Sequence, residues 1–325
     1  MFLLTNKIPF PKNYERFIEL GQEAEKQNHL AESVEYYEQA YAIRQDFPLN
    51  LVLVNMYLAL EEHEQALSLA SEMKEKYFAY LDYLEIYIQI LIQNQMFIQA
   101  HSVINERILM EQSDEMRKLV SLKKKIRHVE LMYQQFEVGK IRELKEELDD
   151  LNKHTYYEQM AIVKKAGRLP QDEFIMIGKK ILLDERVHNL VRSWILEELA
   201  SLHVKEEVEF LWRDNKKYTV IPASVGTPVD SATYQRILLF LEKELLNDDP
   251  ILLVDIMEEI RIHFALLYPL ADQVIENPEL WAVSYIISYN HSIAKKFQVD
   301  EKHSEIEKIQ QIQSQIRFEL EKMVL

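Results

Sequence analysis

The sequence contains no cysteine, and it contains only five glycines in 325 residues. The absence of cysteine excludes disulfide frameworks, thiolate metal sites and cysteine nucleophiles, and it suits a reducing compartment. Glycine normally makes up roughly 7% of residues, and sheets, phosphate-binding loops and tight hairpins all use it. Its scarcity therefore favours helices that are joined by short polar turns.

Long apolar runs are also absent. No stretch approaches the ~20 apolar residues that a membrane-spanning helix needs. The first residues, MFLLTNKIPFPKNYERF, contain only a few apolar side chains before Pro9 and Pro11, so they do not match a secretory signal peptide. We therefore expect a cytoplasmic protein that does not insert into a membrane.

The sequence lacks the local motifs that mark common active sites. It contains no GxGxxG or GxxxxGKS/T phosphate loop, no HExxH zinc motif and no GxSxG nucleophile turn. Its ten histidines are dispersed, and we interpret them as helix-surface residues and not as metal ligands. We therefore expect a protein that is not an enzyme and has no cofactor, no metal site and no catalytic residue. An enzyme with a cryptic active site is a remote alternative.

Positive charge is in short supply. The chain carries 54 acidic and 38 basic residues, which gives a formal net charge of −16. Because an acidic protein repels the phosphate backbone, we expect no nucleic-acid partner. Residues 111–170 differ, since they carry 13 basic and 11 acidic residues. We interpret their basic run as a solvated helix face or a source of internal ion pairs: Arg117, Lys118, Lys123, Lys124, Lys125 and Arg127.

Hydrophobic residues make up 48% of the chain, and in the first third they recur with a fixed period. Three segments can be superposed, and each contains two apolar stretches of helical periodicity that are separated by a short polar break. Such breaks predict antiparallel helix pairs. The small residues of the second stretches align at spacings of 33 and 34 residues: Ser33, Ala66 and Ala100.

This pattern resembles the tetratricopeptide repeat (TPR), whose period is about 34 residues. The first segment matches the family at five positions: Phe17, Leu20, Gly21, Tyr37 and Ala40. The later segments depart from it, because Val54 and Ile88 stand at the glycine position and Leu91 stands at the tyrosine position. The resemblance implies an all-α solenoid of stacked antiparallel helix pairs, with three TPR-like pairs in residues 1–110.

In TPR proteins the first helix of each pair lines a concave groove that receives peptides or helices. The resemblance implies that one face of these helices is the partner-binding groove here: Glu15, Gln22, Glu25, Lys26, Asn55, Asp82, Glu85, Gln89 and Gln93. Ile18 and Gln22 stand where TPR proteins that clamp a C-terminal carboxylate have lysine and asparagine, which disfavours that ligand. The acidic and amide side chains suit a basic or amphipathic segment. The alternative is that they are ordinary solvated positions.

The remainder of the chain is also predicted to be mainly helical. Apolar residues spaced by three and four in 115–136 favour a helical hairpin over 111–152 that caps or links the array. We expect residues 153–325 to form a helical C-terminal domain with a HEAT-like helix pair near 171–202. Alternating apolar residues predict one β-hairpin at about 208–221, with its turn at Asp214 and Asn215, that covers apolar helix surface.

Over most of its length the chain resembles uncharacterised TPR-containing proteins of low-GC Gram-positive bacteria, and this resemblance implies no activity. We expect a non-catalytic scaffold or adaptor that binds a peptide or helical segment of another protein in the TPR groove. The alternative is a peptide-responsive regulatory receptor of the TPR type. The oligomeric state is open, because an exposed end of an array can pair with itself.

Overall fold

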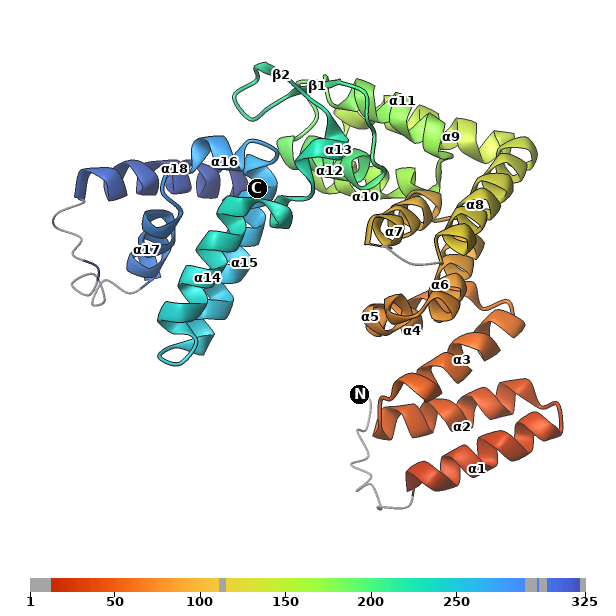
Figure 1. Cartoon of the computed structure of the whole chain (residues 1–325). Coiled ribbons are helices and arrows are strands. Elements are labelled where there is room, and N and C mark those ends of the chain that lie inside the picture. The colour runs from red at the N-terminus through yellow and green to blue at the C-terminus, as the bar shows by residue number, and fades with distance from the viewer. Residues whose placement is uncertain (1–12, 111–114, 290–296, 298–302, 322–325) are drawn as a thin grey trace. The chain divides into compact units, whose positions relative to one another are not determined.

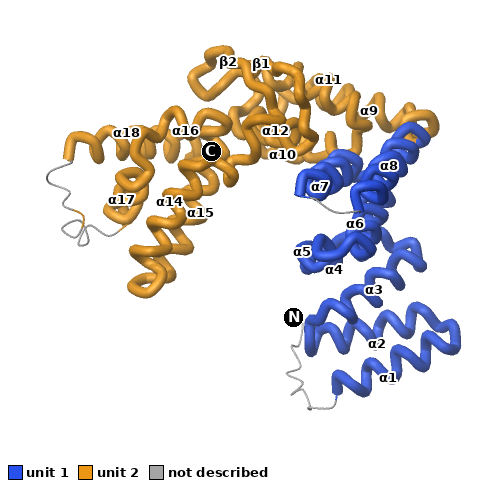
Figure 2. The backbone as a smooth tube through the Cα atoms, in the orientation of Figure 1, with its two compact units in different colours: residues 1–132 blue, residues 133–325 orange. Residues whose placement is uncertain are grey.

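A computed structural model describes residues 13–110, 115–289, 297 and 303–321 (Figure 1). The chain divides into two compact units, residues 1–132 and 133–325 (Figure 2). In the described residues, helices form almost all of the regular structure, and two short strands form one antiparallel sheet. The all-α, TPR-like solenoid class that the sequence predicts is confirmed.

The first unit consists of helix pairs in chain order. Its helices are α1 (Asn13–Lys26), α2 (Leu30–Ile43), α3 (Phe47–Ala59), α4 (His63–Glu72), α5 (Lys74–Ala79), α6 (Leu81–Gln93), α7 (Phe97–Met110) and α8 (Met116–Phe136), which continues past the boundary between the units. Helices α1 and α2, α3 and α4, and α6 and α7 form the three pairs, and α2 packs on α3 and α4 on α6 (Figure 1). One contiguous core runs through all of them because no pair can bury its apolar face alone.

The helices of each pair cross at a small residue of the second helix. Ser33, Ala66 and Ala100 have no exposed surface. The Ser33 hydroxyl donates a 2.7 Å hydrogen bond to the carbonyl oxygen of Gly21, so the two backbones of the first pair approach closely. The small residues that the sequence analysis aligned are therefore the contact points of the repeat.

A left-handed residue ends the first helix of each pair. Asn28, Glu61 and Gln95 have φ angles of 62°, 60° and 61°. In each pair the next amide donates to the carbonyl oxygen five residues earlier, for example Glu62 N to Tyr57 O at 2.8 Å. This is the Schellman ending, in which glycine usually occupies the left-handed position. The chain uses asparagine, glutamate and glutamine there instead.

Helix α5 is an addition to the repeat. The sequence predicts that the second helix of the second pair continues to Tyr77, but it ends at Glu72 and α5 begins at Lys74. The break brings the buried Tyr77 hydroxyl to the Asn50 side chain, to which it donates a 2.8 Å hydrogen bond. The Asn50 amide in turn donates to Leu69 O at 2.9 Å. This satisfied polar contact holds α5 against α3 and α4.

The second unit begins with two further helix pairs, α9 (Val138–Asp149) with α10 (Tyr156–Lys165) and α11 (Gln171–Ile181) with α12 (Asn189–Ser201). The corresponding helices of the two pairs begin 33 residues apart. Helix α9 packs on α11, and α10 packs on α12, so the pairs are stacked. Helices α11 and α12 lie where the sequence predicts a HEAT-like pair. The predicted division at 111–152 and 153–325 stays a prediction.

The β-hairpin is confirmed. Strand β1 (Val208–Leu211) pairs antiparallel with β2 (Lys217–Val220), and Phe210 lies opposite Tyr218. Asn215 adopts a φ of 57° in the connecting turn. The Leu211 amide donates a 2.8 Å hydrogen bond to Leu182 O at the end of α11, and Phe210 is buried. The hairpin therefore lies against the helices, as the sequence predicts.

The remaining helices form a second apolar core. They are α13 (Pro222–Val225), α14 (Ala232–Leu245), α15 (Pro250–Leu267), α16 (Ala271–Val274), α17 (Pro278–Tyr289) and α18 (His303–Glu321). Phe264, Trp281 and Tyr285 are fully buried at the centre of this core, where α15 and α17 pack together. Helix α18 packs against both of these helices.

Replacing Gly21 with alanine is expected to destabilise the first unit. An added Cβ would lie 2.6 Å from the Tyr37 ring, which is buried and has no room to move. Overpacking of this kind costs about 1–3 kcal/mol. Gly139→Ala in α9 is the matched control, because no atom lies within 4 Å of its added Cβ, and it should stabilise by about 0.5 kcal/mol. Urea unfolding followed by circular dichroism measures both changes, and equal effects would contradict this packing.

Replacing Glu61 with glycine is expected to stabilise the protein. The left-handed conformation costs a residue with a Cβ roughly 1–2 kcal/mol, and glycine avoids that cost. We expect a gain of about 1 kcal/mol in the free energy of unfolding. Gln65→Gly, four residues later on the exposed face of α4, should lose about 1 kcal/mol. The left-handed assignment fails if the two substitutions change stability in the same direction.

Candidate protein-binding groove

All nine side chains that the sequence assigns to the groove are exposed. They lie on α1, α3 and α6, which are the first helices of the three pairs. Their assignment as a binding surface stays a prediction, because solvent exposure is common to most polar residues.

Helices α6 and α8 together form a depression of about 240 Å³. Three of the predicted residues line it on the α6 side, namely Glu85, Gln89 and Gln93. Its apolar wall comes from both helices: Ile88, Ile92, Leu122 and Val129. Ile88 and Leu122 also belong to the core of the first unit, so the depression has a fixed floor.

Opposite charges face each other across the depression. Lys125 Nζ on α8 lies 3.4 Å from Glu85 Oε1 on α6. Both side chains are more than half exposed, so the pair contributes little to stability. Both groups stay accessible to a ligand, and each offers a charge-assisted hydrogen bond.

The other predicted residues do not line this depression. The Glu25 carboxylate accepts a 3.2 Å hydrogen bond from Tyr37 Oη, and burial together with this carboxylate raises the pKa of Tyr37 to about 12. The Asn55 amide donates to Leu51 O at 2.8 Å within its own helix. Both side chains therefore also serve the packing of their own helix pair.

The sequence analysis missed the α8 side of the depression. It assigned Leu122 and Val129 to an apolar seam of a capping hairpin, and it assigned Lys125 to a solvated basic run. The seam was a correct signal that α8 buries one face, since Leu119 and Ile126 are fully buried. The pattern did not show that the neighbouring residues border α6.

A buried ionic contact fixes α8 against α7. His101 Nε2 lies 3.3 Å from Glu130 Oε1, and both side chains are almost completely buried. Arg127 Nη1 lies 2.6 Å from Glu130 Oε2 and shields the same carboxylate at the surface. Since α8 supplies one wall of the depression, this contact also sets the shape of the groove.

Among the described residues, no helix combines the length and the apolar composition that crossing a membrane requires. The same part of the chain includes no group of three or more histidine, aspartate and glutamate side chains placed to hold a metal ion.

Comparison with known proteins supports the repeat assignment. The chain is 25% identical over 290 residues to the TPR repeat-containing protein YsoA of Bacillus subtilis (strain 168), and the match covers 85% of this chain and 84% of the relative. No family model and no solved structure matches the chain. The predicted resemblance to TPR-containing proteins of low-GC Gram-positive bacteria is confirmed. The chain thus has a repeat fold of a kind that generally binds other proteins and is generally not catalytic.

Replacing Glu130 with leucine is expected to cost about 3 kcal/mol, because it leaves buried His101 without its acidic partner. The double variant with His101→Leu should lose less than the single variant, since it removes both buried polar groups. Lys124→Leu on the exposed face of α8 is the control and should change stability by less than about 0.5 kcal/mol. A double variant whose loss equals the sum of the two single losses would show that the contact contributes nothing.

Proposed function

We propose that the first unit is a non-catalytic scaffold or adaptor that holds a peptide or helical segment of another protein against α6 and α8. The observation that carries the proposal is the depression with an apolar floor and a charged rim. We place this function in the cytoplasm, in keeping with a chain that contains no cysteine.

The size of the depression favours a protein segment over a free small molecule. Sites for small molecules and cofactors usually enclose roughly 300–1,000 Å³. A volume of about 240 Å³ between Ile88, Ile92, Leu122 and Val129 suits one large apolar side chain. Protein interfaces commonly concentrate their binding energy in one such anchor.

The rim supports recognition of the segment around that anchor. Gln89 and Gln93 each carry a donor and an acceptor that suit backbone groups of an extended or helical ligand. Glu85 and Lys125 offer one charge of each sign. The exposed acidic residues of α1 and α6, such as Glu15 and Asp82, add negative charge that suits a basic or amphipathic ligand.

Gln89→Trp tests this function. The indole should fill the depression and prevent the anchor from binding, so proteins that the full chain captures from the lysate of its native host should be lost at least about tenfold. Glu106→Trp, on the exposed face of α7, is the matched control and should keep them. Thermal unfolding of both variants checks that the fold is intact. Equal capture by the wild type and by both variants would show that the depression is not the binding surface.

A further inference from the structure

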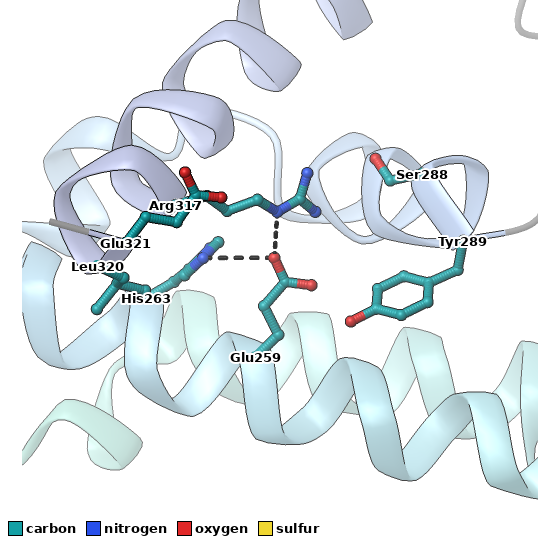
Figure 3. A pocket seen from close by; sticks show the side chains of 7 residues that line it. All are labelled: Glu259, His263, Ser288, Tyr289, Arg317, Leu320 and Glu321. Atoms are coloured by element: carbon teal, nitrogen blue, oxygen red, sulfur yellow. Dashed lines mark hydrogen bonds and ion pairs between the residues drawn. The ribbon is translucent and has the colours of Figure 1, made fainter. Parts of the chain in front are cut away.

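The second unit contains a separate cavity of about 420 Å³ between α15, α17 and α18 (Figure 3). Its polar lining includes Glu259 and His263 of α15, Tyr289 of α17 and Arg317 of α18. The cavity lies outside the first unit, so it is independent of the groove proposed above. Its side chains form an ordered chain of hydrogen bonds that ends at a carboxylate.

The chain of hydrogen bonds starts in the apolar core. Trp281 Nε1 donates to Tyr285 Oη at 3.4 Å, and Tyr285 Oη lies 2.5 Å from His263 Nδ1. Burial lowers the pKa of His263 to about 4, so the imidazole is neutral at pH 7. Because the indole can only donate, the Tyr285 hydroxyl passes its hydrogen to Nδ1 of His263. The remaining imidazole proton is then on Nε2, which faces Glu259 Oε1 at 3.4 Å.

The Glu259 carboxylate is only half used. Its Oε1 atom accepts a 2.5 Å hydrogen bond from Arg317 Nε and faces His263. Its Oε2 atom is buried, and no described residue donates a hydrogen bond to it. Figure 3 shows this second oxygen on the side of Tyr289. A buried carboxylate oxygen without a donor is costly, so its retention points to a ligand that supplies one.

The charges of the lining favour a cation as that ligand. Glu259 and Glu321 face a single positive charge on Arg317, and His263 is neutral, so the lining carries a formal net charge of −1. The ring of Tyr289, about half exposed, stands beside the free oxygen, and aromatic faces attract cations. Leu320 adds an apolar surface for an alkyl stem.

We propose that this cavity binds an organic cation, a primary ammonium or guanidinium group, that donates a hydrogen bond to Glu259 Oε2 and lies beside Tyr289. Arg317 engages the other carboxylate oxygen, so it holds the carboxylate in place without occupying the binding position. The cation comes either from a lysine or arginine side chain of a protein or from a small free amine, since both present the same group.

The test uses the full chain and ligand-detected NMR titrations. The probes are n-butylammonium and methylguanidinium as free cations and the peptide acetyl-Gly-Ser-Lys-Ser-Gly-amide as the protein source, with n-butanol and acetate as uncharged and anionic controls. We expect saturable binding of the cations and none of n-butanol or acetate. Tighter binding of the free cations supports a small amine as the natural ligand, and tighter binding of the peptide supports a protein side chain.

Three variants test the assignment of the residues. Glu259→Gln should weaken cation binding by at least about tenfold, because it removes the charged acceptor. Glu258→Gln, the exposed neighbour on the same helix, should leave the Kd within about twofold. Tyr289→Leu, at a position that is not buried, should weaken binding about threefold and keeps the test valid if Glu259→Gln does not fold. Absence of cation binding to the wild type, binding of n-butanol as tight as that of the amine, or unchanged affinity in Glu259→Gln would overturn the proposal.

Discussion

Close approach of two helix backbones is the constraint on which the first unit depends. Each second helix crosses its partner at Ser33, Ala66 or Ala100, and none of these side chains has exposed surface. A larger residue there would push the helices apart, and the apolar faces that they share with the next pair would no longer meet. The left-handed residues at Asn28, Glu61 and Gln95 recur with the same spacing and return the chain at the required angle. The position of α6, and hence of the groove, follows from this repeated geometry.

The second unit satisfies the same stacking requirement with different chemistry. Counted from the helix start, Gln159 of α10 and Arg192 of α12 take the places that small residues take in the first unit. Both are buried, and both bond backbone carbonyls, Gln159 that of His154 at 3.1 Å and Arg192 that of Asp184 at 2.9 Å. Polar anchoring here replaces close backbone contact. The Glu259 carboxylate differs from these groups, because one of its oxygens has no donor among the described residues.

The sequence allowed the repeat, its period and the β-hairpin to be predicted, because small, apolar and turn residues recur where the backbone needs them. It did not allow α5 to be predicted, since the break at Met73 has no proline or glycine and depends on the distant contact between Tyr77 and Asn50. The stacking of α9 to α12 was missed because Gln159 and Arg192 do not repeat a residue type. Glu85, Gln89 and Gln93 were predicted, whereas the opposite wall from α8 required knowledge of which helix lies beside α6. The pairing of Glu259 with Arg317 joins residues 58 apart, which no local pattern can show.

The central claim is that the groove between α6 and α8 contacts a protein partner, and the absence of cysteine permits a direct measurement. A single cysteine introduced by Gln89→Cys can be labelled with benzophenone maleimide and irradiated in lysate of the native host, beside the same label on Glu106→Cys of α7. The account predicts that a distinct protein is crosslinked from position 89 and not from position 106, and that excess unlabelled wild-type protein competes it away. The same products from both positions, or none from position 89, would contradict it.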